Sequence, residues 1–331
     1  MRNLGVSRRQ LLKNALQSAA VCGAGAAILP ARAVTSRPQP GLRIGISTLG
    51  FTGHTNADLA KELAGAGFNL IQLFFTQTDS KFWHHNNRTD VSSLTPARCR
   101  EIASMYRDAG HTLHSLGVYA NLIHPDDTEL KANLANFEAM MEIGGHMGVR
   151  TFVTESGHFR DPKAPASGMP LHFQGAAWTR MVETMRTLSG LAAKHDAKIL
   201  LEPSFLSFFA TSSRVRRFVE EVDSPRVRVL LDPANILELD DLDEMFRQLA
   251  PWIDCLHAKD RKYHTDRGVA AGKGDMDYRR FVTLAAKHTP TAPLIFEYVG
   301  ARDYLDALAH LRGAMRDVGI TEAVCGGSTK Q

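Results

Sequence analysis

Four acidic or histidine side chains stand at the ends of four successive apolar runs in the second half of this 331-residue chain. The runs "LLEPS", "LLDPAN", "CLHAKD" and "IFEYVG" supply Glu202, Asp232, His257 and Glu297. Each run is followed by about 25 to 40 residues before the next, enough for one strand and one helix. Taken alone, each residue has an ordinary explanation, such as a carboxylate accepting hydrogen bonds in a turn or a hydrogen-bonded core histidine.

Taken together, these four residues indicate a metal site. Three carboxylates side by side at the ends of buried strands repel one another and lose hydration, unless protons or a cation compensate their charge. One imidazole and three carboxylates suit a divalent cation and leave positions open for substrate oxygens. We therefore expect the four side chains to hold one divalent metal ion.

Other polar residues near strand ends are candidates for substrate contact. Lys259 shares a strand face with His257 by period-two alternation. It can act in catalysis by stabilising developing negative charge, bind a substrate hydroxyl, or simply pair with a carboxylate. Asp260 can bind substrate or orient Lys259. The remaining candidates, for which simple solvation is the alternative, are Glu155, His114, His124 and His158.

The elements that must position these residues are eight apolar strand-like runs, each followed by a helix-like pattern. One helix pattern places Leu59, Leu63 and Ala66 on a common face, and a later one places Leu305, Leu308 and Leu311. The strand candidates span residues 42–48, 70–75, 112–117, 150–155, 198–203, 227–232, 253–258 and 293–299.

Strands separated by helices pair in parallel through crossover connections. Eight such units closing on themselves predict an α/β fold, a single-domain (β/α)8 TIM barrel over residues 42–317, whose active sites lie where the strands end. An open doubly wound sheet is the alternative, but "STLGFTGHTN" after the first strand lacks its G-x-G-x-x-G turn.

The motifs "LLEP", "VLLDPANIL", "HAKD", "GKGDMDYRRF" and "IFEYVG", in this order, resemble the xylose isomerase-like TIM barrel family over about residues 42 to 317. That family includes ketose 3-epimerases, inosose dehydratases and proteins called sugar phosphate isomerases/epimerases. The resemblance implies Glu202, Asp232, His257 and Glu297 as ligands of one divalent ion, manganese first, with magnesium, cobalt or zinc as alternatives. It also implies that Glu202 and Glu297 act as acid and base on opposite faces of a substrate carbon.

Two positions depart from the ketose epimerase pattern. Asn235 stands where those enzymes carry a substrate-contacting histidine, and Phe208 stands where they carry a glutamate. We expect Asn235 to contact the substrate. The aromatic run "SFLSFF" can cover a sugar face or an aglycone, or it can pack within a half-buried loop. Endonuclease IV shares the barrel, but Asn235 and the lack of a D-x-H pair after His257 argue against that activity, as does the predicted export of the chain.

The expected activity is that of a sugar isomerase or epimerase that abstracts a proton next to a carbonyl through an enediolate. The alternatives are a lyase or dehydratase acting on a keto-sugar or keto-glycoside at the same metal site, and a noncatalytic sugar-binding barrel. No phosphate-cradling motif is evident. The glycine-rich "AAGKGDMD" suits a flexible cover over the site.

The N-terminus predicts export. Paired Arg8 and Arg9 in "SRRQLLKN" precede a short, small-residue apolar run and "ARA", which resembles a twin-arginine signal peptide cleaved near Ala33. The expected partner is the twin-arginine export machinery and the destination is the periplasm or exterior, whereas a retained membrane anchor is the alternative. The predicted segments are a signal at 1–33, a linker at 34–41, the barrel at 42–317 and a tail at 318–331.

Charge and cysteine content exclude other classes. The formal net charge of +4 falls to −1 once the signal and its five basic residues leave, so no nucleic-acid-binding surface is expected. The four cysteines, Cys22, Cys99, Cys255 and Cys325, have neither a disulfide framework's spacing nor that of a structural zinc site. A homo-oligomer remains an open alternative.

Overall fold

The computed structural model describes residues 41–159 and 171–323, which belong to one compact unit, Gln39–Gln331. Eight parallel strands form a closed barrel in the order β1-β10-β7-β6-β5-β4-β3-β2, closed because β1 pairs with both β10 and β2. This confirms the predicted (β/α)8 barrel. The strands are β1 (Ile44–Ser47), β2 (Leu70–Leu73), β3 (Thr112–Gly117), β4 (Thr151–Thr154), β5 (Lys198–Leu201), β6 (Val227–Leu231), β7 (Ile253–Ala258) and β10 (Leu294–Phe296).

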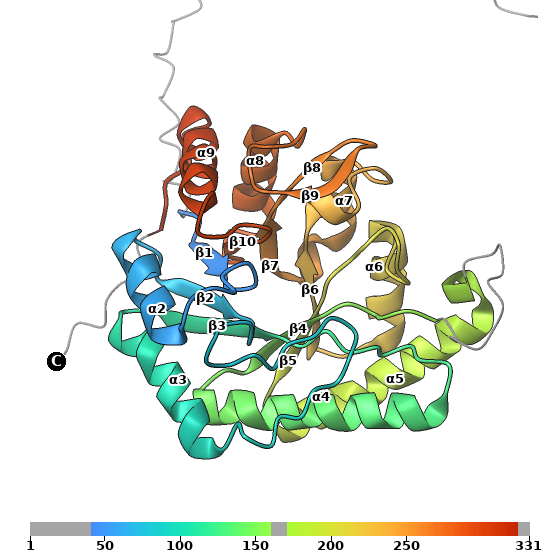
Figure 1. Cartoon of the computed structure of the whole chain (residues 1–331). Helices are drawn as coiled ribbons and strands as arrows, with labels where there is room; N and C mark the ends of the chain where they lie inside the picture. Colours follow the sequence, from blue (N-terminus) through green and yellow to red (C-terminus); the bar gives the residue numbers. More distant parts are fainter. Residues whose placement is uncertain (1–40, 160–170, 324–331) are drawn as a thin grey trace, which may run out of the picture. The chain divides into compact units, whose positions relative to one another are not determined.

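Helices surround the barrel, as Figure 1 shows. In the described part of the chain they are α2 (Asn56–Gly65), α3 (Pro96–Asp108), α4 (Asp127–Met147), α5 (Gly175–Lys194), α6 (Ser212–Val222), α7 (Leu242–Leu249), α8 (Tyr278–His288) and α9 (Tyr304–Asp317). Many begin at a side chain that accepts a hydrogen bond from the first turn, as Thr55 does for α2, Asp126 for α4 and Asp277 for α8. Such caps satisfy an otherwise unpaired backbone N–H and set where the helix starts.

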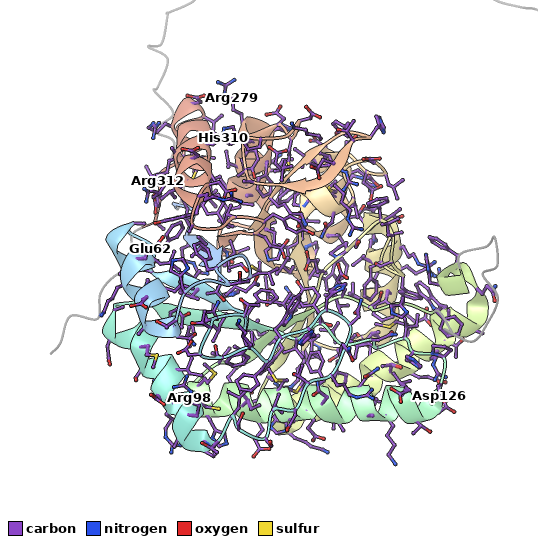
Figure 2. All side chains as sticks on the ribbon, in the orientation of Figure 1. Glu62, Arg98, Asp126, Arg279, His310 and Arg312 are labelled. Carbon is purple, nitrogen blue, oxygen red and sulfur yellow. The ribbon has the colours of Figure 1, made fainter. Side chains whose placement is uncertain are left out.

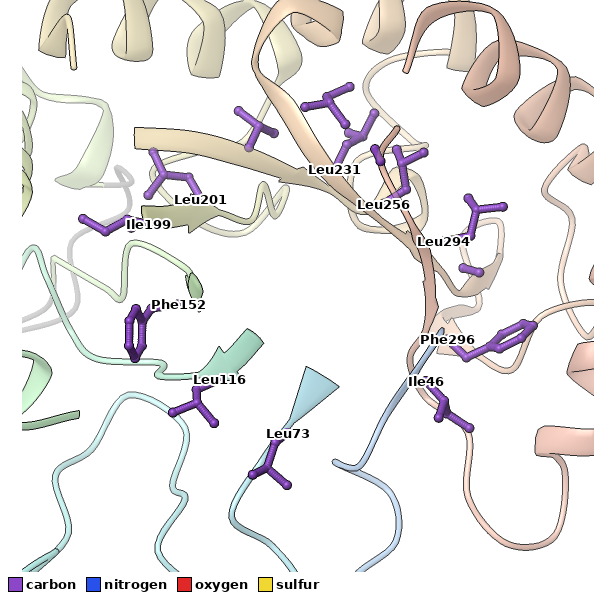
Figure 3. Close-up of a cluster of buried hydrophobic side chains, with 14 of the residues drawn as sticks. Ile46, Leu73, Leu116, Phe152, Ile199, Leu201, Leu231, Leu256, Leu294 and Phe296 are labelled. Atoms are coloured by element: carbon purple, nitrogen blue, oxygen red, sulfur yellow. The ribbon is translucent and has the colours of Figure 1, made fainter. Parts of the chain in front are cut away.

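The apolar faces of the helices pack against the outer face of the barrel. Figure 3 shows side chains such as Ile199, Leu201 and Leu231 directed outward from the strands, and all three are fully buried. In α2 the predicted face is correct for Leu59 and Leu63, which are buried, whereas Ala66 is the half-buried residue that caps the helix. In α9 the prediction was wrong for Leu305, which is 56% exposed. There the buried face consists of Tyr304, Ala307, Leu308, Leu311, Ala314 and Met315.

A second, smaller apolar cluster fills the barrel interior. It contains residues at alternate positions in the strands or just after them: Phe74, Tyr119, Val153, Leu200, Leu230, Cys255 and Ile295. Successive strand residues point to opposite faces, so Leu200 points inward while its neighbours Ile199 and Leu201 point outward. The polar residues at the carboxyl ends of the strands lie directly above this inner apolar layer.

Two features differ from the predicted organisation. A two-stranded antiparallel hairpin, β8 (Asp260–Lys262) and β9 (Asp266–Val269), follows β7 directly. The predicted tail begins with an ordered segment: Glu322 forms a parallel bridge with Leu42, and Arg312 of α9 pairs with Glu322 at 2.7 Å. Arg312 is labelled in Figure 2. The residue two positions before β1 is thereby joined to the segment that follows α9.

The predicted signal peptide, its cleavage site near Ala33 and most of the linker lie outside the described residues, as do Cys22 and Cys325. Within residues 41–159 and 171–323, no helix is both long and apolar enough to cross a bilayer. Cys99 and Cys255 are buried and free.

Candidate metal centre

Strand alternation brings four polar side chains into the barrel above its inner apolar layer. The inward-facing residues Leu200, Leu230, Cys255 and Ile295 are each followed two positions later by Glu202, Asp232, His257 and Glu297. Because the carboxyl ends of parallel barrel strands meet at one rim, residues up to 95 positions apart converge there. The same alternation continues beyond His257 to Lys259.

The four predicted ligands lie close enough together to share one ion. Each offers one nitrogen or oxygen atom within 4.8 Å of the others, and all four are buried. His257 Nδ1 lies 3.4 Å from Glu202 Oε1, 3.7 Å from Asp232 Oδ2 and 3.6 Å from Glu297 Oε2. The structure therefore brings together the complete predicted ligand set.

The atoms and charges of this cluster fit a divalent cation. Asp232 Oδ1 and His257 Nδ1 are buried and have no hydrogen-bond partner among the described residues. Such unpaired atoms are costly to bury unless another group satisfies them. Three carboxylates and the ammonium of Lys259 leave a net charge of −2 when His257 is neutral, so one divalent ion neutralises the cluster. The donor set, one imidazole and three carboxylates, suits such an ion.

The pKa values of His257, Glu297 and Asp232 are shifted by burial and by the excess of negative charge in the cluster. Burial lowers the pKa of His257, but the carboxylates of Glu297 and Glu202 raise it more, to about 10 overall. Burial raises the pKa of Glu297, with Lys259 opposing that rise and Glu202 adding to it. For Asp232, burial acts upward, but Lys259 and His257 hold its pKa below the ordinary value. A positive charge at the centre is thus favoured.

Lys259 is anchored at the edge of the cluster. Its Nζ lies 2.8 Å from Asp232 Oδ2, and it donates hydrogen bonds to Glu297 Oε2 at 3.1 Å and Asn235 Oδ1 at 2.7 Å. Asn235 in turn donates through Nδ2 to Glu202 Oε1 at 2.8 Å. Lys259 therefore does form the ion pair with a carboxylate that the sequence allowed as one of its possible roles. Both Lys259 and Asn235 also line the cavity into which the cluster opens, where a substrate can reach them.

Gln72 is a site residue that sequence reasoning missed. His257 donates from Nε2 to Gln72 Oε1 at 2.9 Å, and Gln72 donates from Nε2 to Ser115 Oγ at 3.2 Å. This contact keeps the Nε2 proton in place and leaves Nδ1 as the free ligand atom, as the hydrogen-bond partners of metal-bound histidines commonly do. The only sequence signal was a polar residue at an inward position of the apolar run "LIQLFF".

Replacing this glutamine tests the arrangement. Gln72→Leu is expected to weaken divalent-metal affinity by about 10- to 100-fold, because His257 loses the partner that fixes its tautomer and ring orientation. A competition titration against a fluorescent chelator measures the affinity. Gln77→Leu is the matched control, since Gln77 is equally buried but bonds to the backbone oxygen of Thr48. Unchanged affinity in Gln72→Leu would contradict the role assigned to the hydrogen bond.

A second group missed from the sequence surrounds Glu202. The hydroxyl of Tyr119 donates a hydrogen bond to Glu202 Oε2. The ring of His85 lies 5.7 Å from that of Tyr119, and His85 Nε2 is 3.2 Å from Glu155 Oε2. The hydrogen bond to Glu155 raises the pKa of His85 and outweighs the opposing effect of burial. Loop histidines and core tyrosines carry no distinctive spacing, which is why the sequence did not reveal them.

The cluster opens into a cavity of about 320 Å³. Its inner wall carries Glu202, Glu297, Asn235 and Lys259, and its outer residues come from loops at the carboxyl ends of the strands. The remaining lining includes Leu49, Trp83, His85, Asn86, Tyr119, Glu155, Gly157, His158, Ser204, Phe205, Leu206, Ser207, Arg261, Arg267 and Tyr298. Polar groups converging on one end of a concave site are typical of small-molecule binding.

The structure corrects the prediction of substrate contact for His114. Its side chain lies beside Thr151, Lys198 and Asp254, at the amino-terminal ends of β4, β5 and β7, opposite the metal cluster. Burial lowers the pKa of His114 to about 4, and its Nδ1 lies 3.0 Å from Ser115 Oγ. Position 114 precedes the end of β3 by three residues, so it faces the wrong end of the barrel.

The structure also corrects the prediction that Asp260 contacts the substrate. Its carboxylate is buried and accepts hydrogen bonds from the backbone N–H groups of Arg261, Gly272 and Met276 at 2.8 to 3.0 Å. These bonds tie the segment "AAGKGDMD" to β8, and none of its residues lines the cavity that the segment was expected to cover. Asp260 does not line the cavity, so it has no direct access to a substrate there.

The other predicted positions divide between the cavity and the periphery. Glu155 and His158 line the cavity, whereas His124 does not and accepts a hydrogen bond at Nδ1 from the backbone of Asp126. In the aromatic run, Phe208 and Phe209 are fully buried and pack against Phe218. Loop packing is therefore their role, while Phe205 and Leu206 reach the cavity.

The sequence matches one protein family over most of its length. A family described as "Xylose isomerase-like TIM barrel" matches residues 60–314, most of the chain, and the protein belongs to this family. A search of the curated proteins found no match.

Solved structures share the fold at low sequence identity. The 3-keto-D-glucoside 4-epimerase YcjR from E. coli is 18% identical with a TM-score of 0.64, over 82% of this chain and 99% of that one. The probable 3-DHS dehydratase AsbF from Bacillus anthracis is 18% identical with a TM-score of 0.65, over 82% and 98%. A xylose isomerase-like TIM barrel protein from Mycobacterium smegmatis, in complex with magnesium, is 16% identical with a TM-score of 0.63, over 86% and 98%.

Proposed function

We propose that this protein is a divalent-metal-dependent sugar isomerase or epimerase that moves a proton at a carbon next to a carbonyl. The observation that carries the proposal is the pair Glu202 and Glu297, which approach one buried cluster from β5 and β10, separated in the barrel by β6 and β7. Two carboxylates on different sides of one site can remove a proton from one face of a carbon and return it to the other.

Each residue of the cluster has a distinct part in this chemistry. The divalent ion would be held by the four cluster residues Glu202, Asp232, His257 and Glu297, and manganese is the first metal to test. When bound, the ion polarises the substrate carbonyl and makes the neighbouring C–H more acidic. Glu297 accepts the proton, and the C–H electron pair passes into the enediolate. Glu202, held by Tyr119 and Asn235, takes up a proton from solvent in the cavity and delivers it to the opposite face of the carbon. Glu297 then releases its proton to solvent, which restores both carboxylates. Lys259, beside Glu297, stabilises the negative charge that develops on the substrate oxygens.

A screen of keto-sugars and keto-glycosides in deuterated water, followed by NMR, tests the proposal. Deuterium entering one carbon without loss of a group supports isomerisation or epimerisation. The keto-glucosides are tested first because the similar E. coli protein is named for a 3-keto-D-glucoside. Binding of these sugars with no exchange and no turnover in the metal-loaded protein would instead point to a noncatalytic sugar-binding barrel.

A keto-glycoside lyase or dehydratase is the second candidate, and the pair His85–Glu155 favours it. The carbanion formed by proton abstraction can expel a β-oxygen, which leaves more readily if an acid protonates it. His85 lines the cavity, and its hydrogen bond to Glu155 at 3.2 Å raises the pKa of the ring, which favours the protonated form that such an acid needs. Loss of water or an aglycone in the NMR screen, impaired in His85→Gln, would support this reaction over epimerisation.

We also propose that the protein is exported in folded form by the twin-arginine route, on the strength of Arg8, Arg9 and the small-residue site before position 34. Arg8→Lys together with Arg9→Lys is expected to leave the protein uncleaved inside the cell. N-terminal sequencing of the secreted wild-type protein is expected to start near Val34. Arg2→Lys is the matched control and should be exported normally, whereas export of the Arg8/Arg9 variant would refute the route.

A further inference from the structure

A second cavity, of about 530 Å³, lies beside the cavity of the metal cluster. It is formed between the loop after β1 and the loop after β10, two neighbouring strands (Figure 1). Leu49 and Tyr298 line both cavities and so form the wall between them. The first cavity, at about 320 Å³, is near the lower end of the range of ligand pockets, about 300–1,000 Å³. The neighbouring cavity offers room for a larger substrate.

Tyr298 in this wall lies next to the proposed base, and its backbone conformation and neighbours constrain it. It follows Glu297 directly, has φ of 54°, and remains 48% exposed. A bulky residue rarely adopts positive φ, so the surrounding contacts must hold it there. Lys259 Nζ lies 4.3 Å from the ring centroid, and a Cβ at Gly268 of β9 would lie 2.5 Å from ring atom Cε1. Glycine at 268 thus lets the hairpin pack closely against the ring.

The second cavity has the chemistry to receive a ring-shaped group. Leu49 and Ala301 are at least partly exposed and give its lining apolar surface, while Phe51 and Val299 of the same lining are almost fully buried. His54 pairs with Glu62 at 2.9 Å, whereas the side chain of Arg302 has no hydrogen-bond or ion-pair partner among the described residues. Apolar surface, an exposed aromatic ring and a few polar groups suit a second sugar or an aryl group. In the first cavity, by contrast, the Arg261 guanidinium already lies over the ring of Phe205, 4.5 Å from the ring centroid. That face of the Phe205 ring is therefore not free to receive a second ring of the substrate.

We infer that this second cavity is a subsite for the ring attached to a keto-sugar, and that the substrates are keto-glycosides with a second ring rather than free keto-sugars. This inference rests on the proposed function, because it assumes that the keto-sugar binds at the metal cluster. The reacting ring lies between Glu202 and Glu297. The glycosidic bond passes the exposed side chain of Tyr298, and the attached ring lies in the second cavity.

Gly53 allows the subsite to be filled without disturbing the metal cluster. It lines the second cavity, and a Cβ there meets no atom within 4 Å. In Gly53→Trp, kcat/KM for the phenyl glycoside of a keto-glucose is expected to fall about five- to tenfold, while kcat/KM for its methyl glycoside stays unchanged. Calorimetry with unoxidised phenyl glucoside, which has no carbonyl to react, is expected to show a similar loss of affinity. A keto-disaccharide, assayed in parallel, separates a preference for sugar from one for aryl groups.

Gly65→Trp is the matched control, because position 65 also has open space around a Cβ but lies at the end of α2. It should leave both substrates unaffected. An equal effect of Gly53→Trp on the methyl and phenyl glycosides, or no effect on either, would overturn the subsite. Turnover of free keto-sugars with no binding of glycosides would also overturn it while leaving the proposed function intact. If no keto-sugar of any kind binds or exchanges, the proposed function itself fails.

Discussion

Glu297→Gln is expected to lower the rate of solvent-deuterium exchange at the substrate carbon by about 10²- to 10⁴-fold, the usual contribution of a positioned acid or base. The amide has nearly the same shape and can still face the cluster, but it cannot accept a proton. NMR of a substrate incubated in deuterated water measures the exchange directly, and it detects proton removal even when the net reaction is reversible.

The controls for this substitution separate chemistry from folding and metal loss. Glu183→Gln, at an exposed position of α5 whose side chain has no hydrogen-bond or ion-pair partner among the described residues, should exchange at the wild-type rate. Metal content and thermal unfolding of Glu297→Gln should be measured alongside, because Glu297 also belongs to the proposed ligand set. An unchanged exchange rate in a variant that retains its metal would remove Glu297 from the mechanism.

Asp232→Asn is expected to lower divalent-metal affinity by more than about 100-fold, a larger loss than for a residue that acts through a ligand. Asp232 is fully buried, and its Oδ1 has no hydrogen-bond partner among the described residues, so a bound ion is the group that would satisfy this atom. Losing one carboxylate also removes part of the negative charge that a cation must balance.

Two measurements check this result. Elemental analysis is expected to find about one ion per wild-type chain and almost none in the variant after dialysis. Added metal should raise the unfolding free energy of the wild type by about 4 kcal/mol when its free concentration is 1,000 times Kd, and should leave that of the variant unchanged. Asp108→Asn, on the exposed side of α3, is the control. Metal bound equally by Asp232→Asn and wild type would place the ion elsewhere.

The fold was predictable because the period of hydrophobicity changes regularly along the chain. Each of the eight predicted strands overlaps an observed one, and β3 (Thr112–Gly117) and β7 (Ile253–Ala258) have the predicted bounds. The hairpin β8–β9 was not predicted, because its sequence, "DRKYHTDRGV", is polar and lacks an apolar alternation. The exposed position of Leu305 shows a related limit, since helical spacing allows more than one apolar face.

The predicted ligand set was brought together because strand ends in a barrel converge on one rim, so the position of a residue within its strand was sufficient. The same logic fails for His114, which belongs to β3 but precedes the strand's end, and for Asp260, whose neighbours from residues 272 and 276 arrive only through the folded loop. Both residues are of a type that could bind a substrate, but neither lies at the cavity.

The sequence by itself therefore determined the barrel and the convergence of Glu202, Asp232, His257 and Glu297, because alternation and strand order are properties of the linear chain. Only the tertiary structure decided which groups surround them. Gln72 orients His257, Tyr119 holds Glu202, and Tyr298 separates two cavities. These contacts join residues from different strands and loops, and they depend on side-chain packing in three dimensions, which no spacing in the sequence encodes.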